Sequence, residues 1–229
     1  MTEYSDTLTP LATPRIELRV PKFGAPAPTD DRFRRLLPPS AWASLPPAVR
    51  VRFSRRLHAG EQRTFVGAVV RTLHSRVGRC LALLARLVGG PLPHMPGATG
   101  PSTVTVTPDN DLGGQIWTRT YARPGRLPQT INSVKRFAGP TGLEEFLGYG
   151  LLMRLTLAVE DGALAFHSAG YDVAFAGWRF PVPRGLAPGH CTITHRDLGQ
   201  GRFRFTLTLD HPWLGRLVEQ VAIYEEITP

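Results

Sequence analysis

The sequence contains little cysteine, little lysine and no long hydrophobic run. Cys80 and Cys191 are the only cysteines among 229 residues, and the opening MTEYSDTLTP has neither the basic nor the apolar stretch of a secretory signal. We therefore expect no disulfide framework and a cytoplasmic location. No apolar run approaches the ~20 residues that a transmembrane helix requires, so no transmembrane segment is predicted.

The motifs of common cofactor and metal sites are also missing. The sequence has no GxxxxGK or GxGxxG loop for phosphate, no GxSxG and no HExxH. His190, Cys191 and His195 resemble metal ligands, but on a strand only Cys191 and His195 share a face, and two ligands do not make a site. We expect neither a cofactor nor a metal.

The excess of positive charge comes almost entirely from arginine. The chain has 27 Lys and Arg against 18 Asp and Glu, a formal net charge of +9, and only Lys22 and Lys135 are lysines. A net positive field attracts anions without specificity. The arginines, however, are scattered from Arg15 to Arg216 and accompany no recognisable nucleic-acid-binding module. We interpret them as a solvated surface and expect no specific nucleic-acid partner.

Proline density and periodicity divide the chain into a tail and one domain. Residues 1–28 are rich in proline, which predicts an extended tail. Residues 29–229 are predicted to form a single domain, and residues 29–100 to be a mainly helical cap with a possible first strand at 64–71. From Ser75 to Gly89–Gly90 the apolar residues repeat every three to four positions, which predicts a helix. Its apolar face either packs in the core or lies on a membrane.

Residues 101–229 carry a β signal throughout. In 202–209, for example, Phe203 and Phe205 alternate with arginines, as in a half-buried antiparallel strand. About nine short strands without helices between them must close into a barrel or protect their edges. We therefore predict an α+β, mainly β fold, an antiparallel barrel or rolled sheet that is calycin-like, with the N-terminal helices packed as a cap. The predicted strands are 103–107, 115–121, 130–137, 151–160, 163–168, 171–179, 191–196, 202–209 and 217–224.

Trp117, Arg119 and Tyr121 share one face of a predicted strand. An arginine that points into a barrel must be paired or must bind an anion. Glu145 is the candidate partner, and Gly148 after it allows close backbone approach. The pair is either a structural ion pair or part of a site that recognises an anion or a carbonyl group.

Five further side chains are weighed as site residues against structural roles. His167 is either on the solvent face or a proton-transfer group. Trp178 either plugs a barrel end or binds a ligand, and His195 is either a core histidine or a ligand contact. Tyr171 and Tyr224 either pack in the core or offer a hydroxyl to a ligand.

Short motifs occur in a fixed order along the chain: FRRLL, Trp42 and LPPAVR within Phe33–Arg50, VGAVVR, RCLALLARLVGGPLP, Trp117-x-Arg119-x-Tyr121, Ser133, Glu145 with Gly148, GWRFPVPRGLAPG, and FRFTLTLDHPWLGRLV. In this order they resemble an uncharacterised bacterial domain family that occurs alone or fused behind saccharopine-dehydrogenase-like reductase domains. The resemblance covers roughly residues 30–226 and implies a strand at 64–71 but no chemistry. The sequence departs from the family near its end, where Gln220, Val221 and Ala222 replace the usual Tyr-x-Gly. Trp117 and Ser133 are predicted ligand-binding residues.

Three functions fit these observations. The first is binding of an apolar or amphipathic small molecule inside the barrel, with the helices as a cap. The second is a cofactor-independent isomerase or cyclase acting on a polyketide- or terpenoid-like chain, in which Arg119 or Tyr121 polarises a carbonyl and Glu145 or His167 transfers protons. The third, suggested only by the resemblance, is an accessory domain that docks on a reductase.

Overall fold

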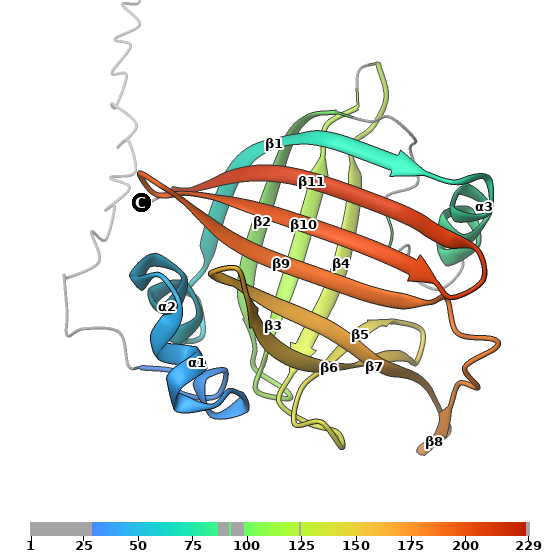
Figure 1. The fold of residues 1–229 in the computed structure, drawn as a ribbon, viewed down its shortest axis with the longest axis horizontal. Coiled ribbons are helices and arrows are strands. Elements are labelled where there is room, and N and C mark those ends of the chain that lie inside the picture. Colours follow the sequence, from blue (N-terminus) through green and yellow to red (C-terminus); the bar gives the residue numbers. More distant parts are fainter. Residues whose placement is uncertain (1–28, 87–91, 93–98, 124, 228–229) are drawn as a thin grey trace, which may run out of the picture.

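A closed antiparallel β-barrel dominates the structure (Figure 1). The computed structural model describes residues 29–86, 92, 99–123 and 125–227, so the predicted tail 1–28 and the predicted helix stop Gly89–Gly90 lie outside the described residues. Within them, eleven strands form one sheet in the order β6-β5-β4-β3-β2-β1-β11-β10-β9-β7-β8, and β6 also pairs with β7. The β6–β7 pairing closes ten strands into a barrel and leaves β8 outside. The strands are β1 (Arg63–His74), β2 (Gly100–Asp109), β3 (Gly114–Tyr121), β4 (Gln129–Arg136), β5 (Glu144–Gly148), β6 (Leu151–Glu160), β7 (Ala163–Phe175), β8 (Trp178–Pro181), β9 (His190–Gly199), β10 (Arg202–His211) and β11 (Gly215–Ile227).

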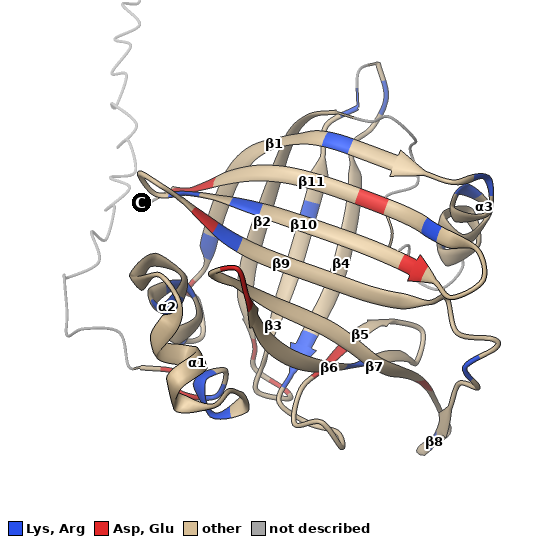
Figure 2. Ribbon diagram, viewed as in Figure 1, with Lys and Arg blue, Asp and Glu red and all other residues tan. Residues whose placement is uncertain are grey.

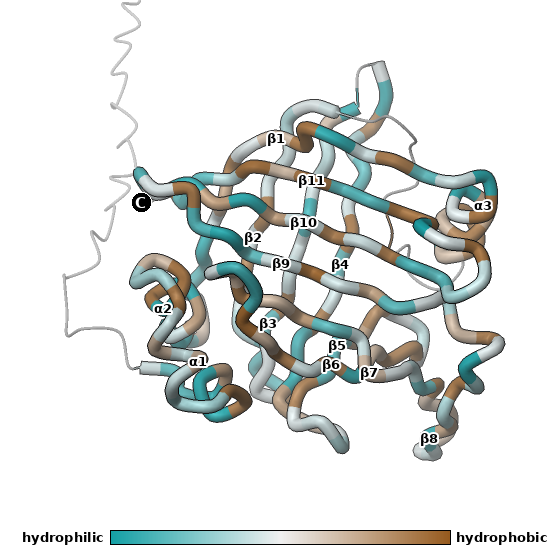
Figure 3. The backbone as a smooth tube through the Cα atoms, viewed as in Figure 1, coloured by the Kyte–Doolittle hydropathy of each residue, from teal (hydrophilic) through white to brown (hydrophobic). Residues whose placement is uncertain are grey.

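The period-two patterns set which side chains fill the barrel. In β10, Phe203 and Phe205 are buried while Arg202 and Arg204 are exposed, as predicted. The same alternation of hydrophobic and hydrophilic positions is visible along the neighbouring strands in Figure 3. The sequence therefore determines which face of each strand points inward.

The strand count and the place of the first strand differ from the prediction. Residues 64–71 belong to β1, a full barrel strand that pairs with β2 on one side and β11 on the other, so they are not part of a cap. The predicted strand 171–179 is two pieces: its first half continues β7, and β8 begins after the turn at Ala176 and Gly177, which both have positive φ. β5, only five residues long, was not predicted.

Helices cover both ends of the barrel, whereas the sequence predicted one cap (Figure 1). A short 3-10 helix (Arg34–Leu36), α1 (Pro39–Ser44) and α2 (Pro47–Ser54) close one end. There, Phe33 is fully buried and packs edge-on against Phe53, Phe137 and Phe166. α3 (Arg76–Ala85) lies at the opposite end. Among the described residues, no helix has the length and apolarity needed to cross a bilayer.

α3 is held against β11 by its first turn. The Ser75 hydroxyl accepts a hydrogen bond from the Gly78 backbone N–H at 3.0 Å, which caps the helix as predicted. The Ser75 N–H donates to the Leu217 carbonyl at 3.0 Å, and a Cβ on Gly78 would lie 1.9 Å from that same carbonyl oxygen. The helix therefore packs through a glycine, and its other buried residues are Ala82 and Ala85.

Of the larger apolar residues of α3, only Leu81 packs against the core, whereas the sequence suggested a whole apolar face there. Val77, Leu83 and Leu84 are all exposed, Leu84 by 62%. Small residues form the buried face because only they allow the helix to approach β11 so closely. The leucines are left at the end of the barrel, beside the site described next.

Candidate functional site

A cavity of about 340 Å³ occupies the α3 end of the barrel. This volume lies within the range of small-molecule sites, roughly 300–1,000 Å³. Leu84 and Leu186 line it and are both largely exposed, so the cavity reaches the surface between α3 and the segment that follows β8. The apolar lining consists of Leu81, Leu84, Ala85, Leu92, Ile131, Leu147, Leu151, Met153, Val182, Leu186, Pro188, Ile193, Phe205, Leu207 and Leu209, and the polar lining of Arg119, Tyr121, Ser133, Glu145, Tyr171, Cys191 and Gln220.

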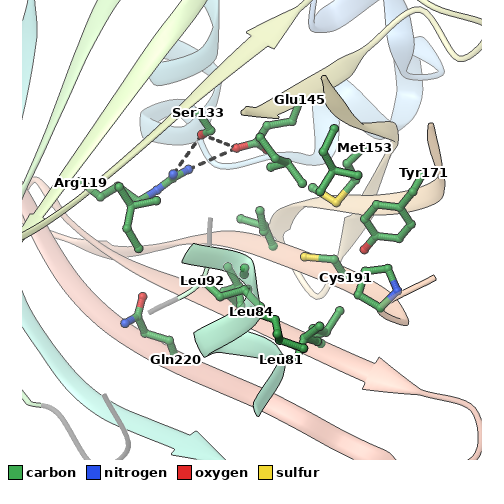
Figure 4. A pocket seen from close by; sticks show the side chains of 18 of the residues that line it. Leu81, Leu84, Leu92, Arg119, Ser133, Glu145, Met153, Tyr171, Cys191 and Gln220 are labelled. Carbon is green, nitrogen blue, oxygen red and sulfur yellow. Dashed lines mark hydrogen bonds and ion pairs between the residues drawn. The ribbon is translucent and has the colours of Figure 1, made fainter. Parts of the chain in front are cut away.

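Three adjacent strands bring Arg119, Ser133 and Glu145 together at one wall of the cavity (Figure 4). Arg119 Nη1 donates to Ser133 Oγ at 3.0 Å, and Arg119 Nη2 lies 3.5 Å from Glu145 Oε1. The Ser133 hydroxyl donates to the same Glu145 oxygen at 2.5 Å. The structure thus places Arg119 beside Glu145, as expected from the sequence, and Ser133, another predicted site residue, links the two.

Lys135 is the fourth member of this cluster and does not itself line the cavity. Its Nζ donates to Glu145 Oε2 at 2.9 Å, and the side chain is only 2% exposed. The same Nζ lies 4.9 Å from the centroid of the Trp117 ring and 5.6 Å from that of Phe166. An ammonium over aromatic faces is attracted by their electrons, which offsets part of its lost hydration.

The cluster keeps Glu145 ionised. Burial alone would raise the pKa of its carboxyl, but the nearby charges of Lys135 and Arg119 and the hydrogen bonds from Lys135 and Ser133 outweigh burial and hold that pKa at about 2. Burial has the opposite sense for Lys135 and lowers its pKa, although Glu145 counters the effect. At neutral pH Glu145 is therefore a carboxylate with both oxygens engaged.

Other polar groups of the lining are neutral hydrogen-bonding groups. The Tyr121 hydroxyl donates to Gln220 Oε1 at 3.1 Å. Burial raises the pKa of the Tyr121 and Tyr171 hydroxyls above their usual range, and raises the pKa of the Cys191 thiol to about 12. The cavity therefore offers hydroxyl, amide and thiol groups without further charge.

Several predicted site residues lie outside the cavity lining. His195 is buried at the α1–α2 end among Phe53, Trp117 and Phe203, and Trp117 packs with it there. Burial, with the nearby Arg52, Lys135 and Arg119 charges, lowers the pKa of His195 well below its usual value. Tyr224 is buried in the barrel, with its hydroxyl 2.9 Å from that of Ser102.

His167 and Trp178 point away from the barrel interior. His167 Nε2 lies 2.8 Å from the exposed Glu160 carboxylate, and its ring stacks on that of His190. Trp178 is 71% exposed on β8, so it does not plug a barrel end. It lies on the outer strand because the turn at Gly177 reverses the chain after β7.

Sequence reasoning missed two polar residues of this region. Lys135 lies two residues after Ser133 on β4, so the two side chains share a face of the strand. That spacing, together with the rarity of lysine in the chain, could have identified Lys135 as a site residue. Gln220 marks the departure from the resembling family, but nothing in its neighbours indicates that Tyr121 contacts it. The leucines of α3 were assigned to the core instead of to a cavity.

The fold and the site define a class of protein: a closed antiparallel barrel whose mainly apolar cavity reaches the surface at one end. Residues 45–222 match the family described as a domain of unknown function (DUF4166), and the chain belongs to that family. Comparison with curated proteins and with solved structures gives no match. The resemblance to an uncharacterised domain family is thereby confirmed, and its fusion to reductase domains remains a prediction.

Proposed function

We propose that this protein binds an apolar or amphipathic small molecule in the barrel cavity. The observation that carries the proposal is the cavity itself, in which apolar side chains surround one polar wall formed by Arg119, Ser133 and Glu145. An apolar chain would cover the leucines and Met153, and an oxygen-bearing end would lie against Arg119. Apolar surface removed from water contributes about 25 cal/mol per Å² to binding before the cost of ordering the ligand.

Binding is favoured over catalysis by the state of the proton-transfer candidates. The low pKa of Glu145 leaves it without a proton to give at neutral pH, and its oxygens are held by Ser133, Arg119 and Lys135. His167 lies on the outer face of the barrel. The isomerase or cyclase alternative thus has Arg119, Tyr121 and Glu145 in the cavity, but Glu145 there is an ionised carboxylate bound by its neighbours, and His167 lies outside.

The distribution of arginines does not favour nucleic-acid recognition as the function. Lys and Arg positions are spread over strands, helices and turns at both ends of the molecule in the ribbon view of Figure 2. Many of them are paired with carboxylates, such as Arg63 with Glu226 and Arg71 with Glu219. Arg119 differs from both the buried Arg63 and the exposed Arg71 because it lines the cavity.

Thermal denaturation against a panel of lipophilic metabolites tests the proposal. We expect a subset of the panel to raise the melting temperature of the natural protein, because a ligand that binds only the folded state stabilises it. Leu207→Trp, which fills the cavity, should abolish these shifts. Leu127→Trp, at a side chain that is 85% exposed and outside the lining, should keep them. Equal shifts in both variants would place the ligand elsewhere and contradict the proposal.

A further inference from the structure

The buried charges around the cavity do not balance. Among the described residues of its lining, Arg119 and Glu145 are the only charged side chains, and Lys135 Nζ lies 2.9 Å from Glu145 Oε2. Two cations therefore face one carboxylate in a region where all three side chains are at least nine-tenths buried. Charges taken out of water are tolerated when they are paired, and one positive charge here has no protein counterpart within the cluster.

The unmatched cation is Arg119. Lys135 lies at hydrogen-bond distance from Glu145, 2.9 Å, whereas the Arg119–Glu145 contact is 3.5 Å, at the limit of a hydrogen bond. Lys135 and Ser133 each donate to one of the two Glu145 oxygens at a shorter distance than Arg119 does. A guanidinium carries five N–H donors in a planar fork, and its contacts to Ser133 and Glu145 use two of them. Arg119 thus keeps donors for a ligand in the cavity that it lines.

We infer that the ligand of this cavity is a monocarboxylic acid with an apolar chain, its carboxylate seated against Arg119. The inference rests on the proposed function and specifies its substrate class. One negative charge restores the balance of the cluster, whereas a phosphate monoester would bring about −1.5 to −2 at neutral pH. A carboxylate also matches the fork geometry of a guanidinium, with two parallel N–H···O bonds.

The rest of the lining suits the other parts of such an acid. The Gln220 side chain accepts a hydrogen bond from the Tyr121 hydroxyl through Oε1, so its amide NH₂ is the donor end of this group in the cavity lining. From this polar wall, Ile131, Met153 and Ile193 continue the apolar surface toward the leucines of α3. The carboxylate end would therefore be deep and the chain end near the mouth at Leu84 and Leu186.

A pair of compounds that differ only in the head group tests the inference. Calorimetric titration with decanoate and with decanol, at neutral pH and constant salt, compares an anionic with a neutral head on the same chain. We expect decanoate to bind at least tenfold more tightly, because hydrogen bonds to a charged group contribute about 1.5–3 kcal/mol and tenfold corresponds to about 1.4 kcal/mol. Arg119→Gln should bring the ratio of the two dissociation constants close to one. Arg204→Gln, an exposed arginine on the outside of β10, should leave that ratio unchanged.

The outcomes separate this inference from the proposed function. Equal binding of the two compounds, tighter binding of decanol, or a ratio that survives Arg119→Gln would overturn the carboxylate assignment and leave the barrel as a binder of neutral lipophilic compounds. Binding of neither compound would also overturn it. In that case the metabolite panel and Leu207→Trp decide whether the proposed function falls as well.

Discussion

Lys135 and Glu145 are two opposite charges that the barrel buries almost completely, 2% and 3% exposed at their side chains. Each is tolerable because the other is present, since an unpaired buried ion loses its hydration without compensation. The pair therefore need not add net stability relative to an apolar pair. Its contribution is to fix the position of the Glu145 carboxylate, on which the orientation of Ser133 and Arg119 depends.

Lys135→Met tests this interdependence. Removing the ammonium breaks the 2.9 Å contact to Glu145 but leaves this carboxylate the longer contact to Arg119, so we expect the free energy of unfolding to fall by about 3 kcal/mol, the lower end for a broken buried ion pair. The double variant Lys135→Met with Glu145→Gln should cost less than the sum of the two single changes, because neither member of this pair is then buried without the other. Urea denaturation measures all four proteins of the cycle. Strictly additive losses would show that the two side chains do not interact.

At the scale of secondary-structure elements, α3 shows how one glycine positions a helix. A Cβ at Gly78 would lie 1.9 Å from the Leu217 carbonyl oxygen, far inside contact distance. The leucines of α3 stay at the cavity because small residues hold the helix against β11. The small residues on the buried face of α3 therefore fix the position of Leu81 and Leu84, which line the cavity.

Gly78→Ala should displace α3 and the two leucines that line the cavity. Alanine is better than glycine inside a helix by about 1 kcal/mol, but overpacking costs typically 1–3 kcal/mol, and a clash with backbone at this distance lies at the upper end. We expect a net loss of about 1–2 kcal/mol in chemical denaturation, together with weaker ligand binding. Gly185→Ala is the matched control, because nothing lies within 4 Å of its added Cβ. A Gly78→Ala protein as stable as the natural one would contradict the close packing.

The sequence predicted the elements whose signal is local and missed those set by distant partners. The alternation in 202–209 and the cap at Ser75 depend on neighbouring residues, and both were predicted. β5 has only five residues and exists because β4 and β6 flank it. Likewise, the Arg119 and Glu145 pair followed from the need to neutralise a buried arginine, but nothing local shows that Lys135 would compete for the same carboxylate.

At the scale of the whole molecule, the two ends of the barrel differ in chemistry. The cavity lies at the α3 end, and a cluster of aromatic rings around His195 fills the barrel beneath α1 and α2. Phe53, Phe166, Phe203 and Phe205 all have ring centroids within 6 Å of the His195 centroid. In this cluster the His195 ring stays neutral, since burial lowers its pKa well below the usual value.

His195 should make the folded protein sensitive to acid. Below pH ~6.5 the unfolded chain protonates this histidine and the folded chain does not, so the free energy of unfolding falls as pH falls, by at most about 1.4 kcal/mol per pH unit. We expect His195→Phe to remove this slope between about pH 6.5 and 5 and to leave the protein at least as stable at pH 7. Urea denaturation at several pH values measures it. His58→Gln, at an exposed position, should keep the natural slope, and a slope unchanged in His195→Phe would refute the assignment.

Closure of the ten strands also bears on how copies of the protein meet one another. A sheet edge presents unpaired N–H and C=O groups that can recruit a strand from another chain, and a closed barrel removes them. β8 is the strand left with a free edge in the sheet order, and it is short, only Trp178–Pro181. Pro181 ends it and Pro183 follows, and neither residue has an N–H to offer a new strand. The exposed aromatic residues of β8 thus lie on a short edge that offers few N–H groups to a strand from another chain.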